Sequence, residues 1–291
     1  MAQMSKARNT FQNQFDEYEP FKGSVPGPFM KTMVEDFNHK HPGMNARYAK
    51  DFGSMFSMVE KDRTQLKNGP MHFIATNSDG AHHSTWRFQR HGDDITAIGI
   101  ESLDQRSVNM GRTAMDFRDL FESKPGFIKS SILIGTGAQK GEHGCGVFAA
   151  NFLNTFHKRP DHFNDLSQDV HRMGRGEQVS RLPDGDIGSE DGKFRTYGDN
   201  TRAFQLLPAH AFKNAQSKSE LKEYQQLAPE ASARPVSKRG ETIEQRQTRL
   251  TDLENPLEDA ERVDMARGID KKRIHLLDSG IKYLETGGSA C

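Results

Sequence analysis

The chain has 291 residues, and its 40 Lys and Arg balance its 40 Asp and Glu, so its neutral charge argues against a generally basic nucleic-acid binder. No apolar run reaches the roughly 18–20 residues of a membrane helix, and the polar N-terminus lacks the apolar centre of a secretory signal peptide. Two cysteines, Cys145 and Cys291, are too few for a disulfide scaffold or a cysteine-rich zinc site.

The N-terminal third alternates between polar and helical patterns. Residues 1–27 are polar and end in a proline- and glycine-rich stretch, which predicts a mostly disordered segment. Phe29, Met33 and Phe37 then recur at helical spacing and predict a helix that stops at residues 41–43 (His-Pro-Gly). A second helix is expected over residues 54–66.

Short strands follow. Strands are predicted at residues 71–76, 84–89 and 95–100, and a turn at residues 91–94 joins the last two as a hairpin. A helix that carries Met110, Ala114 and Phe117 comes next, and residues 127–134 have the composition of a buried strand.

The rest of the chain is more polar. A glycine-rich stretch leads into a helix at residues 147–158, and residues 159–200 are expected to be mostly loop. Further helices are predicted at about 217–226 and 269–284. This order of elements gives an α+β fold close to α/β, in which helices flank one mixed β-sheet.

The glycine-rich stretch GTGAQKGEHGCG allows three interpretations. It lacks the third glycine of a dinucleotide fingerprint and the Gly-Lys-Ser/Thr ending of a P-loop. The third interpretation centres on Cys145, which lies between two glycines just before a helix. Free backbone N–H groups and the helix dipole favour a thiolate there, and small neighbours let a carbonyl group approach the sulfur. The alternative is an inert buried cysteine.

A cysteine nucleophile needs a base and an orienting group. His82 and His83 precede the first strand of the predicted hairpin, and Glu101 follows the second strand. These two ends lie side by side in a hairpin, so an imidazole and a carboxylate can meet. Gln139, six residues before the cysteine, could offer its amide to an oxyanion.

These residues fall within blocks that resemble the YopJ family of type III effector acetyltransferases. The blocks are AHHSTWRFQRHGDDITAIGIES and QKGEHGCGVFAANFL, followed by LPAHAFKNAQSKSELKEY, SKRGETIEQR and DKKRIHLLDSGIKYL. The separations of 19 residues from His82 to Glu101 and 44 from Glu101 to Cys145 agree with that family. The resemblance implies the ubiquitin-like-protein cysteine protease fold and a His-Glu-Cys triad of His82, Glu101 and Cys145, with His83 as the alternative base.

The resemblance also implies a reaction. Acetyl-CoA would acetylate Cys145, and the acetyl group would pass to a Ser, Thr or Lys of a host signalling protein such as a kinase. Gln139 would stabilise the oxyanion. Inositol hexakisphosphate would activate the protein, and no metal is expected. Candidates for binding this polyanion are the cations Lys213, Lys238, Arg239, Arg246, Lys271, Lys272 and Arg273. Lys213 is alternatively a site of autoacetylation.

The implied organisation has four parts. Residues 1–27 form a secretion and translocation segment, 28–205 the catalytic core, 206–285 a regulatory region that completes the inositol phosphate and acetyl-CoA site, and 286–291 a tail. Delivery by a type III system into the host cytoplasm is expected, without a membrane anchor and without a nucleic-acid partner.

Several positions depart from the family pattern. Arg87 stands where an aspartate is common, Ser102 follows the glutamate where proline is frequent, and Gly144 precedes the cysteine where an acid is frequent. Two other functions therefore stay open. One is a cysteine protease of ubiquitin-like proteins that uses the same triad, and the other is a non-enzymatic binder of host proteins or inositol phosphate.

Overall fold

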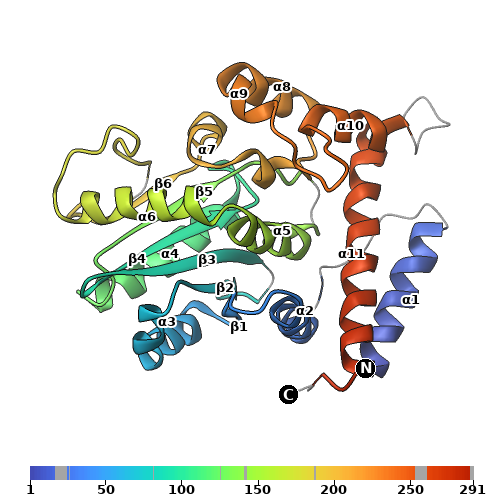
Figure 1. The fold of residues 1–291 in the computed structure, drawn as a ribbon, viewed down its shortest axis with the longest axis horizontal. Coiled ribbons are helices and arrows are strands. Elements are labelled where there is room, and N and C mark those ends of the chain that lie inside the picture. The colour runs from blue at the N-terminus through green and yellow to red at the C-terminus, as the bar shows by residue number, and fades with distance from the viewer. Residues whose placement is uncertain are drawn as a thin grey trace.

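A six-stranded mixed sheet forms the centre of the molecule (Figure 1). The computed structural model describes residues 1–16, 25, 27–80, 82–124, 126–140, 143–186, 188–252 and 261–288. The strands are β1 (Ala46–Ala49), β2 (Met71–Thr76), β3 (His83–His91), β4 (Asp94–Glu101), β5 (Ser130–Gly135) and β6 (Phe194–Tyr197).

The strands lie in the order β1-β2-β3-β4-β5-β6. β2, β3 and β4 pair antiparallel, and the outer pairs β1–β2, β4–β5 and β5–β6 are parallel. Consequently the start of β3 and the ends of β4 and β5 meet at one edge of the sheet. This arrangement confirms the predicted α+β fold with one mixed sheet.

Helices cover both faces of the sheet. They are α1 (Ala2–Asp16), α2 (Gly27–Lys40), α3 (Phe52–Lys61), η1 (Arg63–Lys67), α4 (Val108–Ser123), α5 (Cys145–Lys158), α6 (Pro160–Gly174), α7 (Asn200–Leu206), η2 (Ala209–Phe212), α8 (Lys218–Leu227), α9 (Pro229–Ser232), α10 (Ile243–Asp252) and α11 (Glu261–Glu285). None of these helices in the described ranges combines the length and apolar character needed to cross a bilayer.

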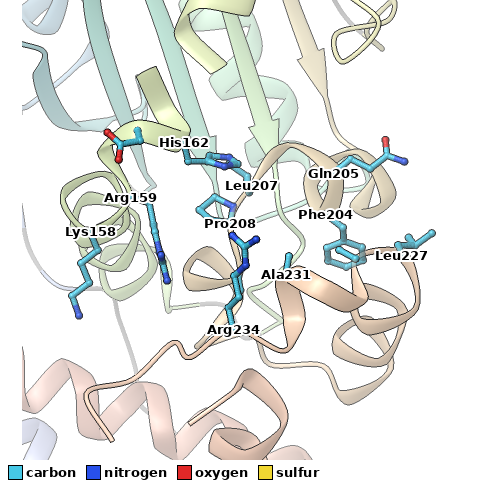
Figure 2. A pocket seen from close by; sticks show the side chains of 13 residues that line it. Lys158, Arg159, His162, Phe204, Gln205, Leu207, Pro208, Leu227, Ala231 and Arg234 are labelled. Carbon is cyan, nitrogen blue, oxygen red and sulfur yellow. The ribbon is translucent and has the colours of Figure 1, made fainter. Parts of the chain in front are cut away.

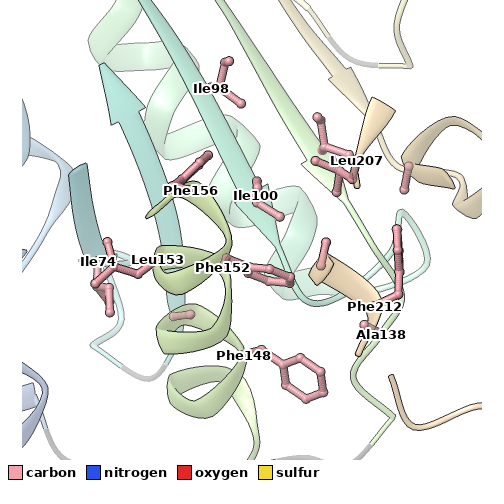
Figure 3. Packing of buried hydrophobic residues seen from close by; sticks show 14 of the residues in the cluster. Ile74, Ile98, Ile100, Ala138, Phe148, Phe152, Leu153, Phe156, Leu207 and Phe212 are labelled. Carbon is pink, nitrogen blue, oxygen red and sulfur yellow. The ribbon is translucent and has the colours of Figure 1, made fainter. Parts of the chain in front are cut away.

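One hydrophobic core lies between the sheet and α5. Figure 3 shows Phe148, Phe152 and Phe156 along α5, next to Ile98 and Ile100 of β4. All five side chains are buried. The spacing of four residues places the three rings on one helix face, and the spacing of two places both isoleucines on one sheet face. This packing fixes the position of the α5 N-terminus relative to the sheet edge.

A second core lies on the opposite face, under α3 and α4. Trp86 of β3 stacks on Phe117 of α4 with ring centroids 4.1 Å apart, and it also meets Phe52 of α3 edge-on. This geometry assigns the single tryptophan to packing.

The N-terminal segment differs from its prediction. Residues 2–16 form α1, which packs along α11 at the edge of the molecule (Figure 1). Met4 and Phe11 are buried in this contact, and Arg8 pairs with Asp278 at 2.8 Å. The prediction of disorder is wrong for this helix because α11, whose Asp278 is 270 residues from Arg8, covers its few apolar side chains. Residues 17–24 and 26 lie outside the described residues.

The polar segment 159–200 also holds more structure than predicted. It contains α6 and β6, and the latter extends the sheet beside β5. Phe163, Leu166 and Val170 recur at helical spacing and are buried, so the helical signal was present among charged neighbours. β1, another sheet member, was not predicted. The division into a core of 28–205 and a regulatory region of 206–285 stays a prediction.

Candidate functional site

Three chain segments bring His82, Glu101 and Cys145 to the same sheet edge. His82 precedes β3, Glu101 ends β4, and Cys145 begins α5. His82 Nε2 lies 2.6 Å from Glu101 Oε1, and a further hydrogen bond joins the His82 side chain to Cys145. Because Nε2 faces the carboxylate, Nδ1 is the ring nitrogen left for the sulfur.

Glu101 is held by its own strand end. Its Oε1 accepts hydrogen bonds from the backbone N–H of Ser102 at 2.6 Å and from the Ser102 hydroxyl at 3.1 Å. The Glu101 side chain is fully buried. A buried carboxylate with these partners has one orientation, and this orientation fixes the His82 ring.

The charge on His82 follows from its neighbours. Burial opposes the imidazolium, but the Glu101 carboxylate and the interactions with Cys145 outweigh it and raise the pKa of His82 to about 10. The imidazolium is therefore the favoured form at neutral pH when its partners carry negative charge. An imidazolium beside a thiolate is the arrangement used by cysteine nucleophiles.

His83 occupies a different environment. Its Nδ1 lies 3.0 Å from Thr76 Oγ1. Burial lowers the pKa of His83 to about 4, so the ring is neutral. Of the two adjacent histidines, the structure brings His82 to the carboxylate.

The backbone around Cys145 is closely packed. Val147 and Phe148 direct their N–H groups to the carbonyl of Gly144, which starts α5. A Cβ at Gly146 would lie 3.2 Å from Met30 Sδ, so a larger residue would require the Met30 side chain to shift by a few tenths of an ångström. Cys145 itself is 2% exposed, and reaching it requires the surrounding chain to admit a ligand.

Gln139 is held next to Gly144 by Ser102. The Ser102 hydroxyl donates to Gln139 Oε1 at 2.7 Å, and the Gln139 N–H donates to the Ser102 carbonyl at 3.0 Å. The amide carbon lies 3.5 Å from where a Cβ of Gly144 would be, so the amide borders the residue before Cys145. Sequence reasoning missed the role of Ser102 in holding both Glu101 and Gln139, since it treated this serine only as a departure from the family.

Arg87 lies away from the thiol. Its guanidinium is buried and donates to Gln89 Oε1 at 2.8 Å and to Asn164 Oδ1 at 2.6 Å. Burial lowers the pKa of Arg87 to about 10. The departure from the family pattern at Arg87 therefore affects the contact between β3 and α6, and not the arrangement of His82 and Glu101.

A cationic cavity of about 310 Å³ lies between α2, α5 and α11. Three of the seven predicted polyanion ligands, Lys213, Lys238 and Lys272, line it. Arg246 adjoins this group, because its Nε donates to the Lys213 carbonyl at 3.2 Å. Sequence reasoning missed further titratable lining residues. They are Asp36 and Lys40 of α2, His41 just after it, Lys158 of α5 and His275 of α11.

The positive charges in this cavity repel one another. Burial lowers the pKa of Lys213 to about 7, and Lys272, Lys158 and Arg246 contribute to the shift. Lys158, Lys213, Lys238 and Lys272 form no ion pair within the described part of the chain. A polyanion would relieve this repulsion.

The remaining candidates lie elsewhere. Burial lowers the pKa of Arg246, and the positive charge of nearby Arg239 contributes to this shift. Lys271 is exposed and does not line the cavity. Arg273 is almost fully buried and lies on the thiol side, where it donates to the backbone carbonyl of His143. Burial lowers the pKa of the Arg273 guanidinium, while Asp270 and the charge of Cys145 act in the opposite direction. Helical rotation separates Arg273 from Lys272 and from the cavity lining, and its role as a ligand of the polyanion stays a prediction.

No three His, Cys, Asp or Glu side chains in the described ranges are grouped so that they could hold a metal ion.

The family model described as YopJ serine/threonine acetyltransferase matches residues 1–279. The chain belongs to this family. Membership supports acyltransferase activity in this YopJ-family protein. A search among curated proteins finds no sequence match.

Solved structures of other YopJ-family proteins share the fold. A deletion variant of AvrA with IP6 and CoA is 17% identical with a TM-score of 0.72, and the match covers 96% of this chain and 98% of AvrA. HopZ1a with IP6 and CoA is 18% identical with a TM-score of 0.68, and the match covers 96% of this chain and 93% of HopZ1a.

Proposed function

We propose that this YopJ-family protein transfers an acetyl group from acetyl-CoA, through a thioester on Cys145, to a Ser, Thr or Lys side chain of a host signalling protein. The observation that carries the proposal is the position of His82 between the Glu101 carboxylate, at 2.6 Å, and Cys145. The proposal includes type III secretion into the host cell, with residues 1–27 as the secretion segment.

In the first half-reaction the Cys145 thiolate attacks the acetyl carbonyl carbon of acetyl-CoA. The C–O double bond opens to an oxyanion, which the Gln139 amide and the Cys145 backbone N–H would stabilise. Collapse of this intermediate breaks the bond to the CoA sulfur and leaves acetyl-Cys145. The protonated His82 gives its proton to the departing CoA thiolate.

In the second half-reaction His82 acts as the base. It takes the proton of the acceptor hydroxyl or amine, whose oxygen or nitrogen attacks the thioester carbonyl. The Cys145 thiolate leaves and regains its imidazolium partner. Glu101 keeps the His82 ring in one tautomer and orientation through both steps.

The cationic cavity supports activation by inositol hexakisphosphate. AvrA and HopZ1a carry IP6 and CoA in their solved structures. In this chain Lys213, Lys238 and Lys272 would hold the phosphates, with Arg246 beside them and Lys158 added by the structure. These residues join α11 to α5, the helix that begins at Cys145, so the polyanion would hold the C-terminal region against the catalytic helix.

Intact-mass spectrometry tests the proposal. The protein is incubated with acetyl-CoA, with and without inositol hexakisphosphate, and then treated with hydroxylamine, which removes a thioester but leaves an amide. We expect a hydroxylamine-sensitive acetyl group that the polyanion increases and that Cys145→Ala abolishes. Cys291→Ala is the matched control and should retain the label. Equal labelling of a protein substrate by the wild type and by Cys145→Ala would refute the mechanism.

The same variants separate the alternatives. Cleavage of a fluorogenic ubiquitin-like substrate without acetyl-CoA would favour a protease. A Cys145→Ala protein that keeps the full effect on host cells would favour a non-enzymatic binder. A hydroxylamine-resistant label lost in Lys213→Gln would identify Lys213 as an autoacetylation site.

A further inference from the structure

A second cavity, of about 520 Å³, lies at the other end of α5 (Figure 2). Its walls are the α5–α6 junction, the segment between α7 and η2, and the helices α8 and α9. The volume is within the range of small-ligand pockets. We call it the α9 pocket, and the residues used below are Lys158, Arg159, Phe204, Leu207, Leu227 and Arg234.

The α9 pocket is separate from the thiol. Lys158 ends the helix that Cys145 begins, and 1.5 Å per residue places these two residues about 20 Å apart along the axis. η2 packs between the two regions, where Asn151 Nδ2 donates to the Ala211 carbonyl at 3.2 Å. A ligand in this pocket therefore does not touch the reacting atoms.

The pocket carries excess positive charge. Lys158, Arg159 and Arg234 line it against one carboxylate, Asp161, and none of these three cations forms an ion pair within the described residues. Figure 2 shows Arg159 and Arg234 extending into the same space from different walls. Burial lowers the pKa of Lys158, and Arg159 is among the charges that lower it further.

The electrostatic effect extends to a neighbouring histidine. Arg159 donates to His210 Nδ1 at 3.3 Å. Burial lowers the pKa of His210 to about 4, and Arg159, Lys213 and Lys158 add to the shift. His210 is thus neutral and accepts from Arg159, which orients that guanidinium at the pocket.

The pocket also has an apolar wall. Phe204, Leu207 and Leu227 line it, and Leu227 is one of the few large apolar side chains left exposed, at 44%. An inorganic anion gains nothing from such a wall, whereas a ligand with an apolar group next to its charge contacts both parts.

We propose that the α9 pocket binds a phosphate ester of an aromatic or other apolar group. The two guanidinium groups and the ammonium group suit a dianionic phosphate better than they suit a single carboxylate. Arginine donates paired hydrogen bonds to phosphate oxygens. Leu227, the exposed member of the apolar wall, covers the apolar group. This chemistry is that of a free aryl phosphate or of a phosphotyrosine side chain in an acceptor protein.

Isothermal titration calorimetry with phenyl phosphate tests this assignment. The titration is run without and with inositol hexakisphosphate, which displaces any phenyl phosphate from the lysine-lined cavity, and each variant is compared with the wild type under the same condition. We expect Arg234→Gln and Leu227→Asn each to weaken phenyl phosphate binding by about tenfold. Both residues are exposed, so these changes should preserve folding. Lys222→Gln on the exposed face of α8 is the matched control and should bind like the wild type.

Two further ligands test the two halves of the pocket. Inorganic phosphate should bind at least about tenfold more weakly than phenyl phosphate, because it lacks the ring. A phosphotyrosine peptide that binds more tightly than phenyl phosphate would identify the source as a protein. Failure of phenyl phosphate to bind, or binding unchanged in both variants, would overturn the proposal. Neither result depends on acetyl transfer, so it leaves the proposed reaction unaffected.

Discussion

Arg273 of α11 donates a hydrogen bond to the backbone carbonyl of His143, two residues before Cys145. The same guanidinium lies over the ring of Phe11 in α1, 5.3 Å from its centroid, and pairs with Asp270 at 3.2 Å. The last helix therefore contacts the loop that carries the thiol, and the first helix contacts the arginine that makes this connection.

Arg273→Gln should make Cys145 less reactive near neutral pH. The change removes a buried positive charge that attracts the thiolate, so the alkylation rates should shift to lower values across a pH series. The charged groups around the sulfur are His82, Glu101 and Arg273, with Asp270 paired to the arginine. Iodoacetamide labelling of the Cys145 peptide, followed by mass spectrometry, measures these rates.

Two variants make this measurement specific. Arg273→Lys keeps the charge and should recover part of the shift, whereas a purely structural role would leave both variants alike. Lys271→Gln, on the exposed side of the same helix, should match the wild type.

Glu101→Gln should slow acetyl transfer by about 10³–10⁴-fold, because a neutral amide no longer stabilises the His82 imidazolium or selects its tautomer. The pKa of His82, about 10 with the carboxylate present, should fall toward its ordinary value. Transfer rates over a pH series test both effects. A variant with wild-type rates would show that the 2.6 Å contact has no role in the reaction.

His82 also links stability to pH. Its pKa is about 10 in the folded protein and near 6.5 when unfolded, so the stabilisation is complete below about pH 6.5. It is then lost as the pH rises toward 10. Urea unfolding at pH 7 and pH 9.5 should show this loss in the wild type and less of it in His82→Gln. Equal losses in both proteins would contradict the assignment.

The affinity for inositol hexakisphosphate should fall as the pH rises above about 7. The pKa of Lys213 is lowered to about 7 by burial and neighbouring cations, and a bound polyanion favours the charged lysine. Binding should therefore take up a proton between about pH 7 and pH 10. Calorimetry in buffers of different ionisation enthalpy measures that uptake. Lys213→Gln should abolish most of it, and Lys67→Gln, exposed on η1, should not change it.

Phe11→Ala should lower the free energy of unfolding by about 3 kcal/mol, because it removes a buried ring from the contact between α1 and α11. Urea unfolding measures the loss, with Thr10→Ala on the exposed side of α1 as the control. Loss of Phe11 should also loosen Arg273 and slow alkylation of Cys145. A fully stable variant would show that α1 is not fixed on α11.

The sequence carried strong local signals for the thiol region. Glycines beside Cys145, the hairpin between His82 and Glu101, and the position of Gln139 all depend on residues close in the chain or on strand pairing. Which cationic side chains gather to bind the polyanion depends on how helices that are distant in the sequence face each other. Adjacent Lys272 and Arg273 point to different regions, and Lys158 belongs to a helix whose pattern suggested only core packing.

Disorder at the N-terminus was predicted from composition alone. α1 has few apolar side chains, but Met4, Ala7, Phe11 and Phe15 recur at helical spacing. The surface that covers them comes from the last helix, so composition alone did not reveal it. The helix α6 also had a clear spacing of apolar residues within the polar segment. The many charged residues of this segment obscured the helical spacing.

Lys158 belongs to the linings of both cavities beside α5. One ammonium group cannot fully neutralise two phosphate groups at once, so the occupants of these cavities should antagonise each other. A high concentration of one anion in the cell would thereby reduce the binding of the other anion to its cavity. The protein would then respond to the ratio of the two ligands through the side chain of Lys158.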